Sequence, residues 1–102
     1  MILLTGATGF LGRAVLEQLI ARGEEVRCFS RNHEKLKNCK DDSAIEFFQG
    51  DIRVFEDVES AVRGVTGIIH LAALKEGKRE DVLAVNWEGT KNLVKVADAS
   101  CV

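Results

Sequence analysis

The first twelve residues constrain the fold of this chain more than any other segment. Four apolar residues, Met1 to Leu4, precede three glycines, and a segment with helical periodicity follows them. Gly6 permits a tight turn after a strand, Gly9 leaves the backbone open to close approach, and Gly12 lets a helix pack closely on that strand. The segment therefore predicts a buried strand, a glycine turn and a helix, in that order.

This arrangement is typical of a dinucleotide site, because free N–H groups and the positive end of the helix dipole would face a pyrophosphate. The glycines are spaced Gly6-x-x-Gly9-x-x-Gly12, whereas the common fingerprint is Gly-x-Gly-x-x-Gly. A glycine turn in some other α/β protein is the alternative. A P-loop is excluded, because no Gly-Lys-Ser or Gly-Lys-Thr follows. The candidate cofactor contacts in this segment are Gly6, Thr8, Gly9, Phe10, Leu11 and Gly12.

Length, composition and charge narrow the class of protein. The 102 residues suffice for one domain, residues 1–102, with 46% hydrophobic and 29% charged residues, as in an ordinary globular protein. A net charge of −2 offers no electrostatic basis for binding nucleic acid or an anionic membrane. No apolar run approaches the length of a membrane span, and the start lacks the basic region of a signal peptide. We therefore expect a cytoplasmic protein that binds neither nucleic acid nor membrane.

The cysteines and histidines indicate no metal site. Cys28, Cys39 and Cys101 are an odd number and form no Cys-x-x-Cys pair, which argues against a disulfide framework and a zinc site. His33 and His70 lie far apart in sequence and have no ligand-spaced partners. No metal ligand is predicted.

The rest of the chain alternates between apolar strands and amphipathic helices. Strands are expected at residues 1–5, 25–30, 45–49 and 66–73. Helices are expected at residues 10–22, 55–63 and 81–99, with a short helical turn at 34–37. This alternation calls for a parallel sheet with right-handed crossovers. We predict an α/β, three-layer, doubly wound Rossmann fold with strand order 3-2-1-4, which binds its ligand in the crevice between the first and fourth strands.

Two of these helices show clear apolar faces. The stripe on the first helix comprises Leu11, Val15, Leu16, Leu19 and Ile20, and Gly23 ends that helix as a C-terminal cap. The face of the last helix comprises Val82, Val85, Gly89, Leu93, Val96 and Ala97.

Four motifs occur along the chain in a fixed order. They are Thr5-Gly-Ala-Thr-Gly-Phe-Leu-Gly12, Gly50-Asp51-Ile52-Arg53, His70-Leu71-Ala72-Ala73 and Val85-Asn86-x-x-Gly89-Thr90-x-Asn92-Leu93. With these motifs the chain resembles the N-terminal half of an extended short-chain dehydrogenase/reductase, the family of NAD(P)-dependent epimerases, dehydratases and dihydroflavonol-reductase-like enzymes. The resemblance covers nearly all of residues 1–96. It implies hydride transfer between nicotinamide and a carbonyl or alcohol substrate in the full-length parent.

The resemblance also implies roles for individual residues. Asp51 would accept a hydrogen bond from the adenine amino group, with Ile52 beside the ring. The alternative for Asp51 is a turn or helix-cap carboxylate. At the exit of the fourth strand, the backbone and methyl groups of Leu71, Ala72 and Ala73 would approach the ribose and pyrophosphate.

The end of the second strand bears on the choice of cofactor. NAD-preferring folds place an Asp or Glu there to bind the ribose 2′-hydroxyl, but this chain has Ser30-Arg31-Asn32. An arginine fork at Arg31 suits a 2′-phosphate. The run from Val26 to Arg31 also resembles that of dihydroflavonol-reductase-type members, which use NADPH. We predict NADP as the preferred cofactor, with NAD as the alternative; a surface arginine is the other interpretation of Arg31.

The acid–base chemistry of the family requires a Tyr-x-x-x-Lys pair, and this chain contains no tyrosine. No catalytic residue is therefore assigned. The resemblance implies that Asn86 helps to order the active-site region, the alternative being a solvated helix residue. We expect the 102 residues to be an incomplete domain that lacks the fifth strand and the substrate lobe. A non-catalytic NAD(P)-binding regulatory module and an NAD-dependent sugar-nucleotide epimerase or dehydratase are the alternatives.

A homodimer is the expected macromolecular partner. In an incomplete sheet, the fourth strand would present Ile68, Ile69 and its free backbone groups as an unprotected edge, which favours pairing with a second copy. The apolar stripe of the last helix is a second candidate surface.

Overall fold

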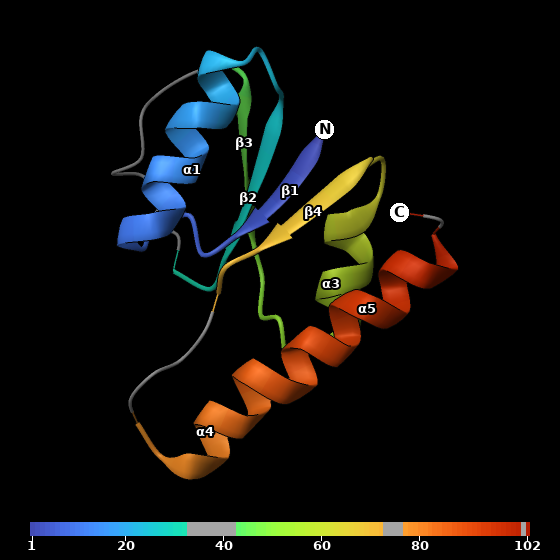
Figure 1. Ribbon diagram of the computed structural model, residues 1–102. Coiled ribbons are helices and arrows are strands. Elements are labelled where there is room, and N and C mark those ends of the chain that lie inside the picture. The colour runs from blue at the N-terminus through green and yellow to red at the C-terminus, as the bar shows by residue number, and fades with distance from the viewer. Residues whose placement is uncertain (33–42, 73–76, 101) are drawn as a thin grey trace.

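The computed structural model describes residues 1–32, 43–72, 77–100 and 102 (Figure 1). Within these ranges, the strands β1 (Ile2–Thr5), β2 (Val26–Ser30), β3 (Ile45–Gln49) and β4 (Gly67–His70) form one parallel sheet. The helices are α1 (Phe10–Ala21), α3 (Phe55–Val62), α4 (Arg79–Leu83), the π-helical η1 (Ala84–Glu88) and α5 (Gly89–Ala99). The sheet order β3-β2-β1-β4 confirms the predicted topology.

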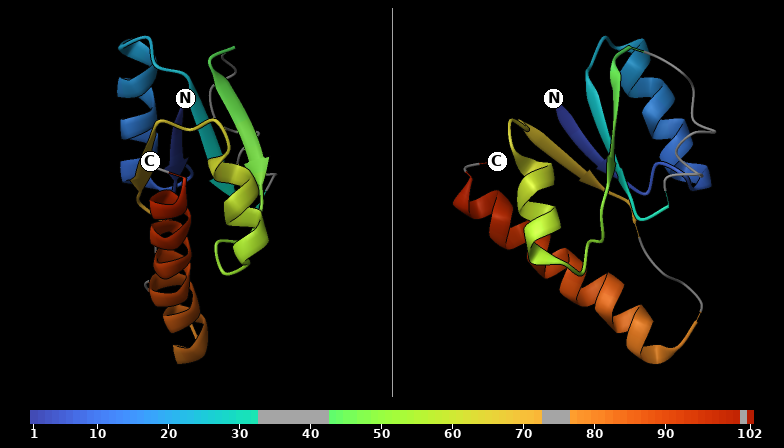
Figure 2. Two further views of the ribbon diagram at one scale, coloured as in Figure 1. Left: turned by 90° about the vertical axis from the view of Figure 1, so that its right-hand side faces the viewer. Right: turned by 180° about the vertical axis from the view of Figure 1, so that it is seen from behind.

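The sheet lies between two helical layers, as the views in Figures 1 and 2 show. Successive side chains of a strand point to opposite faces, so the fully buried Leu3 and Leu4 belong to two different cores. Leu4 packs with Leu16 of α1. Leu3 packs with Val58 of α3 and Leu93 of α5. The predicted three-layer fold is thus confirmed, with both faces of β1 covered, as expected for a parallel sheet.

Helix α1 ends where the sequence predicts. Gly23 adopts φ +78° and donates its N–H to the carbonyl of Ile20 at 3.0 Å, while the N–H of Glu24 reaches the carbonyl of Leu19 at 3.0 Å. This pair of bonds is a Schellman motif, and it satisfies carbonyls that the end of a helix would leave unpaired.

Two expectations about the helices are corrected. Leu11, expected in the buried stripe of α1, is 60% exposed, because it lies in the first turn, beyond the part of α1 that covers the sheet. The C-terminal helical segment begins at Arg79 rather than residue 81, and its middle turn, η1, is π-helical. One extra residue in a turn leaves an apolar pattern nearly unchanged, so periodicity did not reveal it. The turn expected at 34–37 lies outside the described residues.

Candidate functional site

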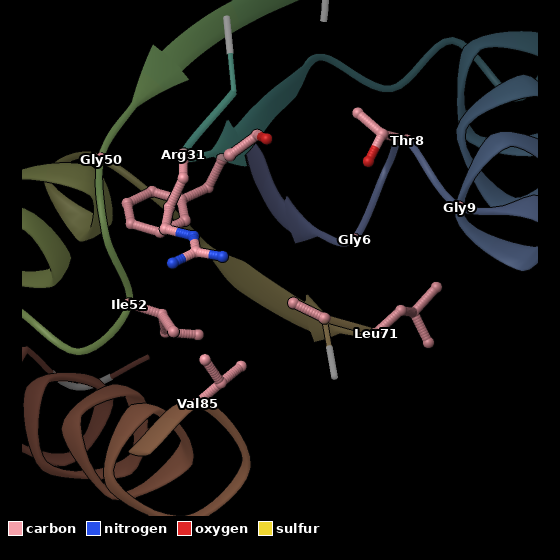
Figure 3. A pocket seen from close by; sticks show the side chains of 11 residues that line it. Gly6, Thr8, Gly9, Arg31, Gly50, Ile52, Leu71 and Val85 are labelled. Carbon is pink, nitrogen blue, oxygen red and sulfur yellow. The ribbon is translucent and has the colours of Figure 1, made fainter. Parts of the chain in front are cut away.

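A cleft of about 300 Å³ opens at the carboxyl edge of the sheet (Figure 3). Each of the four strands contributes to it at or just beyond its carboxyl end, through Gly6, Ser30, Gly50 and Leu71. The complete lining among the described residues is Gly6, Thr8, Gly9, Phe29, Ser30, Arg31, Gly50, Ile52, Leu71, Ala72 and Val85. The cleft therefore lies where open parallel sheets bind their ligands.

The structure gives a different reason for a glycine at each of the three positions of the first turn. Gly6 adopts φ +82°, and a Cβ there would lie 2.7 Å from both the nitrogen of Ala72 and the carbonyl carbon of Leu71. A Cβ on Gly12 would lie 1.7 Å from the carbonyl oxygen of Gly6. At Gly9, the nearest atom to such a Cβ is 3.6 Å away, an ordinary contact. Internal packing thus requires Gly6 and Gly12, whereas Gly9 leaves open space on the cleft.

The N-terminus of α1 is suited to an anion. Gly9 is its N-cap residue, no side chain caps it, and its first turn contains no acidic residue. The first N–H groups of a helix have no partner within the helix, and the helix dipole favours negative charge beside them. The side chains of Phe10, 97% exposed, and Leu11 point away from the protein core. These two residues lie outside the described cleft lining, as does the buried Gly12.

An apolar wall faces the other side of the cleft. It is formed by Phe29 of β2, Ile52 after β3 and Val85 of η1. Phe29 stacks on Phe48, with ring centroids 5.7 Å apart and planes inclined by 14°. Such a wall suits a flat aromatic ring. Sequence reasoning identified Ile52 but missed Phe29 and Val85.

Asp51 lies beside this wall but outside the described lining. Its carboxylate accepts hydrogen bonds from Arg53, the shortest at 2.7 Å from Nη2 to Oδ2. These bonds lower the pKa of Asp51, with the charge of Arg31 a smaller contribution in the same direction. Asp51 is therefore an ionised acceptor at neutral pH. Arg53 also reaches Asp81, with Nη1 and Oδ1 3.9 Å apart.

Arg31 follows directly after β2, as expected, and lines the cleft. Figure 3 shows its guanidinium over the cleft, between the apolar wall and the glycine turn. The side chain is exposed, so its five donors are accessible to an anion.

Of the remaining residues predicted to bind the cofactor, some line the cleft and others do not. Leu71 and Ala72 line the cleft, whereas Ala73 lies outside the described residues. Asn86 is on η1 with an exposed side chain, outside the described lining.

In the part of the chain that the structure describes, no three His, Cys, Asp or Glu side chains gather as a metal site. No helix there is both long and apolar enough to cross a membrane.

Residues 3–102 match the 3-beta hydroxysteroid dehydrogenase/isomerase family. The sterol demethylase protein B of Methylococcus capsulatus is 38% identical over 98 residues, which are 93% of this chain and 30% of that protein. The 3-beta-hydroxysteroid dehydrogenase of Mycolicibacterium neoaurum is 38% identical over 108 residues, covering 91% of this chain and 27% of that protein. The chain thus spans 27–30% of the length of these two curated relatives.

Among solved structures, the UDP-glucose 4-epimerase of Thermus thermophilus, in complex with NAD, superposes with a TM-score of 0.81 at 32% identity. The match covers 99% of this chain and 34% of the epimerase. The structural comparison thus agrees with the sequence comparisons.

Proposed function

The chain belongs to the 3-beta hydroxysteroid dehydrogenase/isomerase family, which confirms the resemblance to extended short-chain dehydrogenases/reductases, and from this we propose that it binds a nicotinamide dinucleotide in the cleft at the carboxyl edge of its sheet. The observation that carries the proposal is the cleft that Gly9 lines, beside an N-terminus of α1 that no side chain caps. In the full-length parent, the bound cofactor would exchange a hydride with a carbonyl or alcohol carbon.

The two sides of the cleft divide the binding between them. The N-terminus of α1, with Gly6, Thr8 and Gly9, would hold the pyrophosphate. The apolar wall would hold the adenine, with Ile52 against the ring. The arrangement of the cleft supports this fit. An anion-binding helix terminus lies on one side and an apolar wall on the other, as the charged pyrophosphate and the aromatic adenine of a dinucleotide require.

The polar contacts to the adenine and the ribose are part of the same proposal. Asp51, ionised beside the apolar wall, would accept a hydrogen bond from the adenine amino group in place of one of the four bonds that its two oxygens accept from Arg53. The backbone of Leu71 and Ala72 would approach the ribose, continued by Ala73, and Asn86 would order the neighbouring helix.

We propose NADP as the preferred cofactor and NAD as the alternative, because Arg31 stands where NAD-preferring folds place a carboxylate. The epimerase of Thermus thermophilus is described with NAD, which supports a dinucleotide site without deciding the 2′-phosphate. An exposed arginine that lines the cleft supports a phosphate contact.

The test is calorimetric titration of the chain with NADP+ and with NAD+ at matched salt. Arg31→Ala should weaken NADP+ binding by about 1.5–3 kcal/mol, the value of a hydrogen bond to a charged group, and leave NAD+ binding unchanged. Arg22→Ala is the matched control, because Arg22 lies at the opposite end of α1 from the cleft. Equal losses for both cofactors in Arg31→Ala would contradict the preference for NADP, and no binding of either would contradict the function.

A second candidate is a non-catalytic NAD(P)-binding module. The 102 residues contain no tyrosine, so the Tyr–Lys pair that the resemblance implies for catalysis is not among them. Both candidates predict cofactor binding. They differ in whether the natural protein that carries these residues also carries a Tyr-x-x-x-Lys pair.

A further inference from the structure

His70, at the end of β4, lies between side chains from two other elements. Its Nδ1 is 2.6 Å from Oγ1 of Thr5 at the end of β1. Its Nε2 is 3.0 Å from Oγ1 of Thr90 on α5. The imidazole ring therefore links the central strand of the sheet to the C-terminal helical segment.

The hydrogen bonds of Thr5 determine the proton on one side of this ring. Thr5 is fully buried, and its Oγ1 accepts hydrogen bonds from the backbone N–H groups of Leu71 and Ala72, each at 3.1 Å. A hydroxyl has two acceptor positions and one proton. Both acceptor positions are used, so the proton of Thr5 points to Nδ1 of His70, which is unprotonated.

The hydrogen bonds of Thr90 determine the proton on the other side. Its hydroxyl donates to the carbonyl oxygen of Asn86 at 2.7 Å, so its oxygen is an acceptor toward His70. The Nε2 of His70 therefore carries the proton. The ring is therefore neutral. In the chain of hydrogen bonds that runs from Thr5 through His70 and Thr90 to Asn86, every hydroxyl and imidazole proton has an acceptor.

This network reaches the candidate site at three points. Gly6, the next residue after Thr5, lines the cleft, and so do Leu71 and Ala72, whose amides bind Thr5. On the far side, Asn86 directly follows Val85 of the apolar wall. The bonds therefore join the backbone beneath the glycine turn to the helical turn that carries part of the apolar wall.

We propose that neutral His70 is a positioning residue for dinucleotide binding, which holds the β4 exit and the η1 turn in the geometry that the cofactor requires. This inference rests on the function proposed above. His70 itself does not line the described part of the cleft, so its effect is exerted through Thr5 and Thr90.

Protonation of His70 would disturb this arrangement. A proton on Nδ1 would face the hydroxyl proton of Thr5. Oγ1 of Thr5 could accept from the protonated ring only by giving up a bond, because both of its acceptor positions are occupied. At least one of the hydrogen bonds from the N–H groups of Leu71 and Ala72 would therefore have to break. Hydroxyls face the ring from β1 and α5, and among the described residues no charged side chain contributes to its pKa. Burial alone lowers the pKa of His70 below the ordinary 6.5.

The direction of the pH effect follows from this shift. Because the pKa is depressed in the folded chain, the neutral ring's contribution to stability is complete above pH 6.5 and is lost as pH falls through the folded-state pKa. Cofactor affinity should fall as pH passes below the folded-state pKa, because the cofactor binds the folded chain and depends on the neutral ring there.

The experiment uses calorimetric titration of the 102-residue chain with NADP+ at pH 7.5. Thr90→Val, which removes the acceptor of Nε2–H and keeps the side-chain shape, should weaken binding roughly three- to ten-fold. Thr90→Ser should restore binding. Thr66→Val is the matched control, because the hydroxyl of Thr66 also donates to a backbone carbonyl, that of Met1, but at the end of β1 and β4 opposite the cleft. This variant should bind NADP+ as the wild type does.

A pH series separates positioning from mere stability. Wild-type affinity should fall below pH 6.5 more steeply than that of His70→Asn, and their comparison cancels the titration of the ligand's own phosphate. Thermal unfolding is measured on the same samples. Lower unfolding temperatures with unchanged affinity in Thr90→Val and His70→Asn would overturn the positioning role and leave the proposed function intact. A wild-type chain that binds neither NADP+ nor NAD+ would overturn both.

Discussion

The side chain of Asn92 donates a hydrogen bond from Nδ2 to the main-chain carbonyl of Ile52 at 3.0 Å. Three residues earlier on the same helix, Gly89 lies against the side chain of Ile52, where a Cβ would be 2.6 Å from Cγ2. Helix α5 therefore fixes, from two positions, a residue that lines the apolar wall of the cleft. The geometry of that wall depends on residues that do not line it themselves.

The contact with Ile52 predicts that Gly89→Ala destabilises the chain. Alanine in place of glycine usually stabilises a helix interior by about 1 kcal/mol. Here the added methyl would overlap Ile52 near its branch point, and overpacking of this kind costs about 1–3 kcal/mol. We expect a net loss of up to about 2 kcal/mol in the free energy of unfolding, measured by urea denaturation.

The matched background is Ile52→Ala, in which the overlapping Cγ1 and Cγ2 atoms are absent. There the same Gly89→Ala change should stabilise the chain by up to about 1 kcal/mol, because only the helix propensity remains. An effect of the same sign in both backgrounds would show that the contact between Gly89 and Ile52 does not control packing.

A second prediction separates two glycines of the first turn. Gly12→Ala places a methyl group on the backbone of Gly6, which cannot rotate away, so we expect a loss of at least about 3 kcal/mol in unfolding free energy. Gly9→Ala meets no close atom and has a compatible φ of −79°, so its stability should change by less than about 0.5 kcal/mol. NADP+ affinity of Gly9→Ala should nevertheless fall roughly tenfold or more.

Denaturation and titration of the two variants together decide this prediction. Gly9→Ala serves as the control for Gly12→Ala in stability, since both make the same chemical change three residues apart. If Gly9→Ala binds NADP+ as tightly as the wild type, the pyrophosphate does not approach this residue.

The sequence predicted the layers and strand order because both depend on repeated features, apolar strands that alternate with amphipathic helices. It also gave Gly9 and Gly12 different roles, close approach of the backbone and close packing of the helix, and the contact of Gly12 with the backbone of Gly6 agrees with the second. The distances that make Gly12 intolerant of a Cβ and Gly9 tolerant of one depend on the folded turn and could not be obtained from the spacing.

The cleft lining was harder to predict where one residue has two roles. Phe29 packs in the core with Leu3 and also lines the cleft, and an apolar residue in a buried strand indicates only the first role. Val85 belonged to a recognised motif, yet its place on the wall depends on the π-helical turn η1. A phenylalanine next to the end of a parallel strand was the available signal, since ligands bind at that edge.

The third prediction is that the chain self-associates as a homodimer. Among the described strands, β4 is at an edge of the sheet, paired with β1. Ile68 and Ile69, however, pack against the two cores, so the strand presents less apolar surface than the sequence suggested. Apart from Phe10 and Leu11 at the start of α1, the most exposed large apolar side chains among the described residues are on the C-terminal helical segment, where Trp87 is 62% and Val94 63% exposed.

We therefore expect the helical face to be the interface, because burial of exposed apolar area drives association. Light scattering over a dilution series should give a mass above the 11.2 kDa of one chain at high micromolar concentration, and the double variant Trp87→Glu, Val94→Glu should be monomeric. Val54→Glu is the control, since Val54 is also exposed but precedes α3. Association that persists in the double variant would assign the interface to the edge of β4, and a wild-type monomer at these concentrations would contradict the homodimer itself.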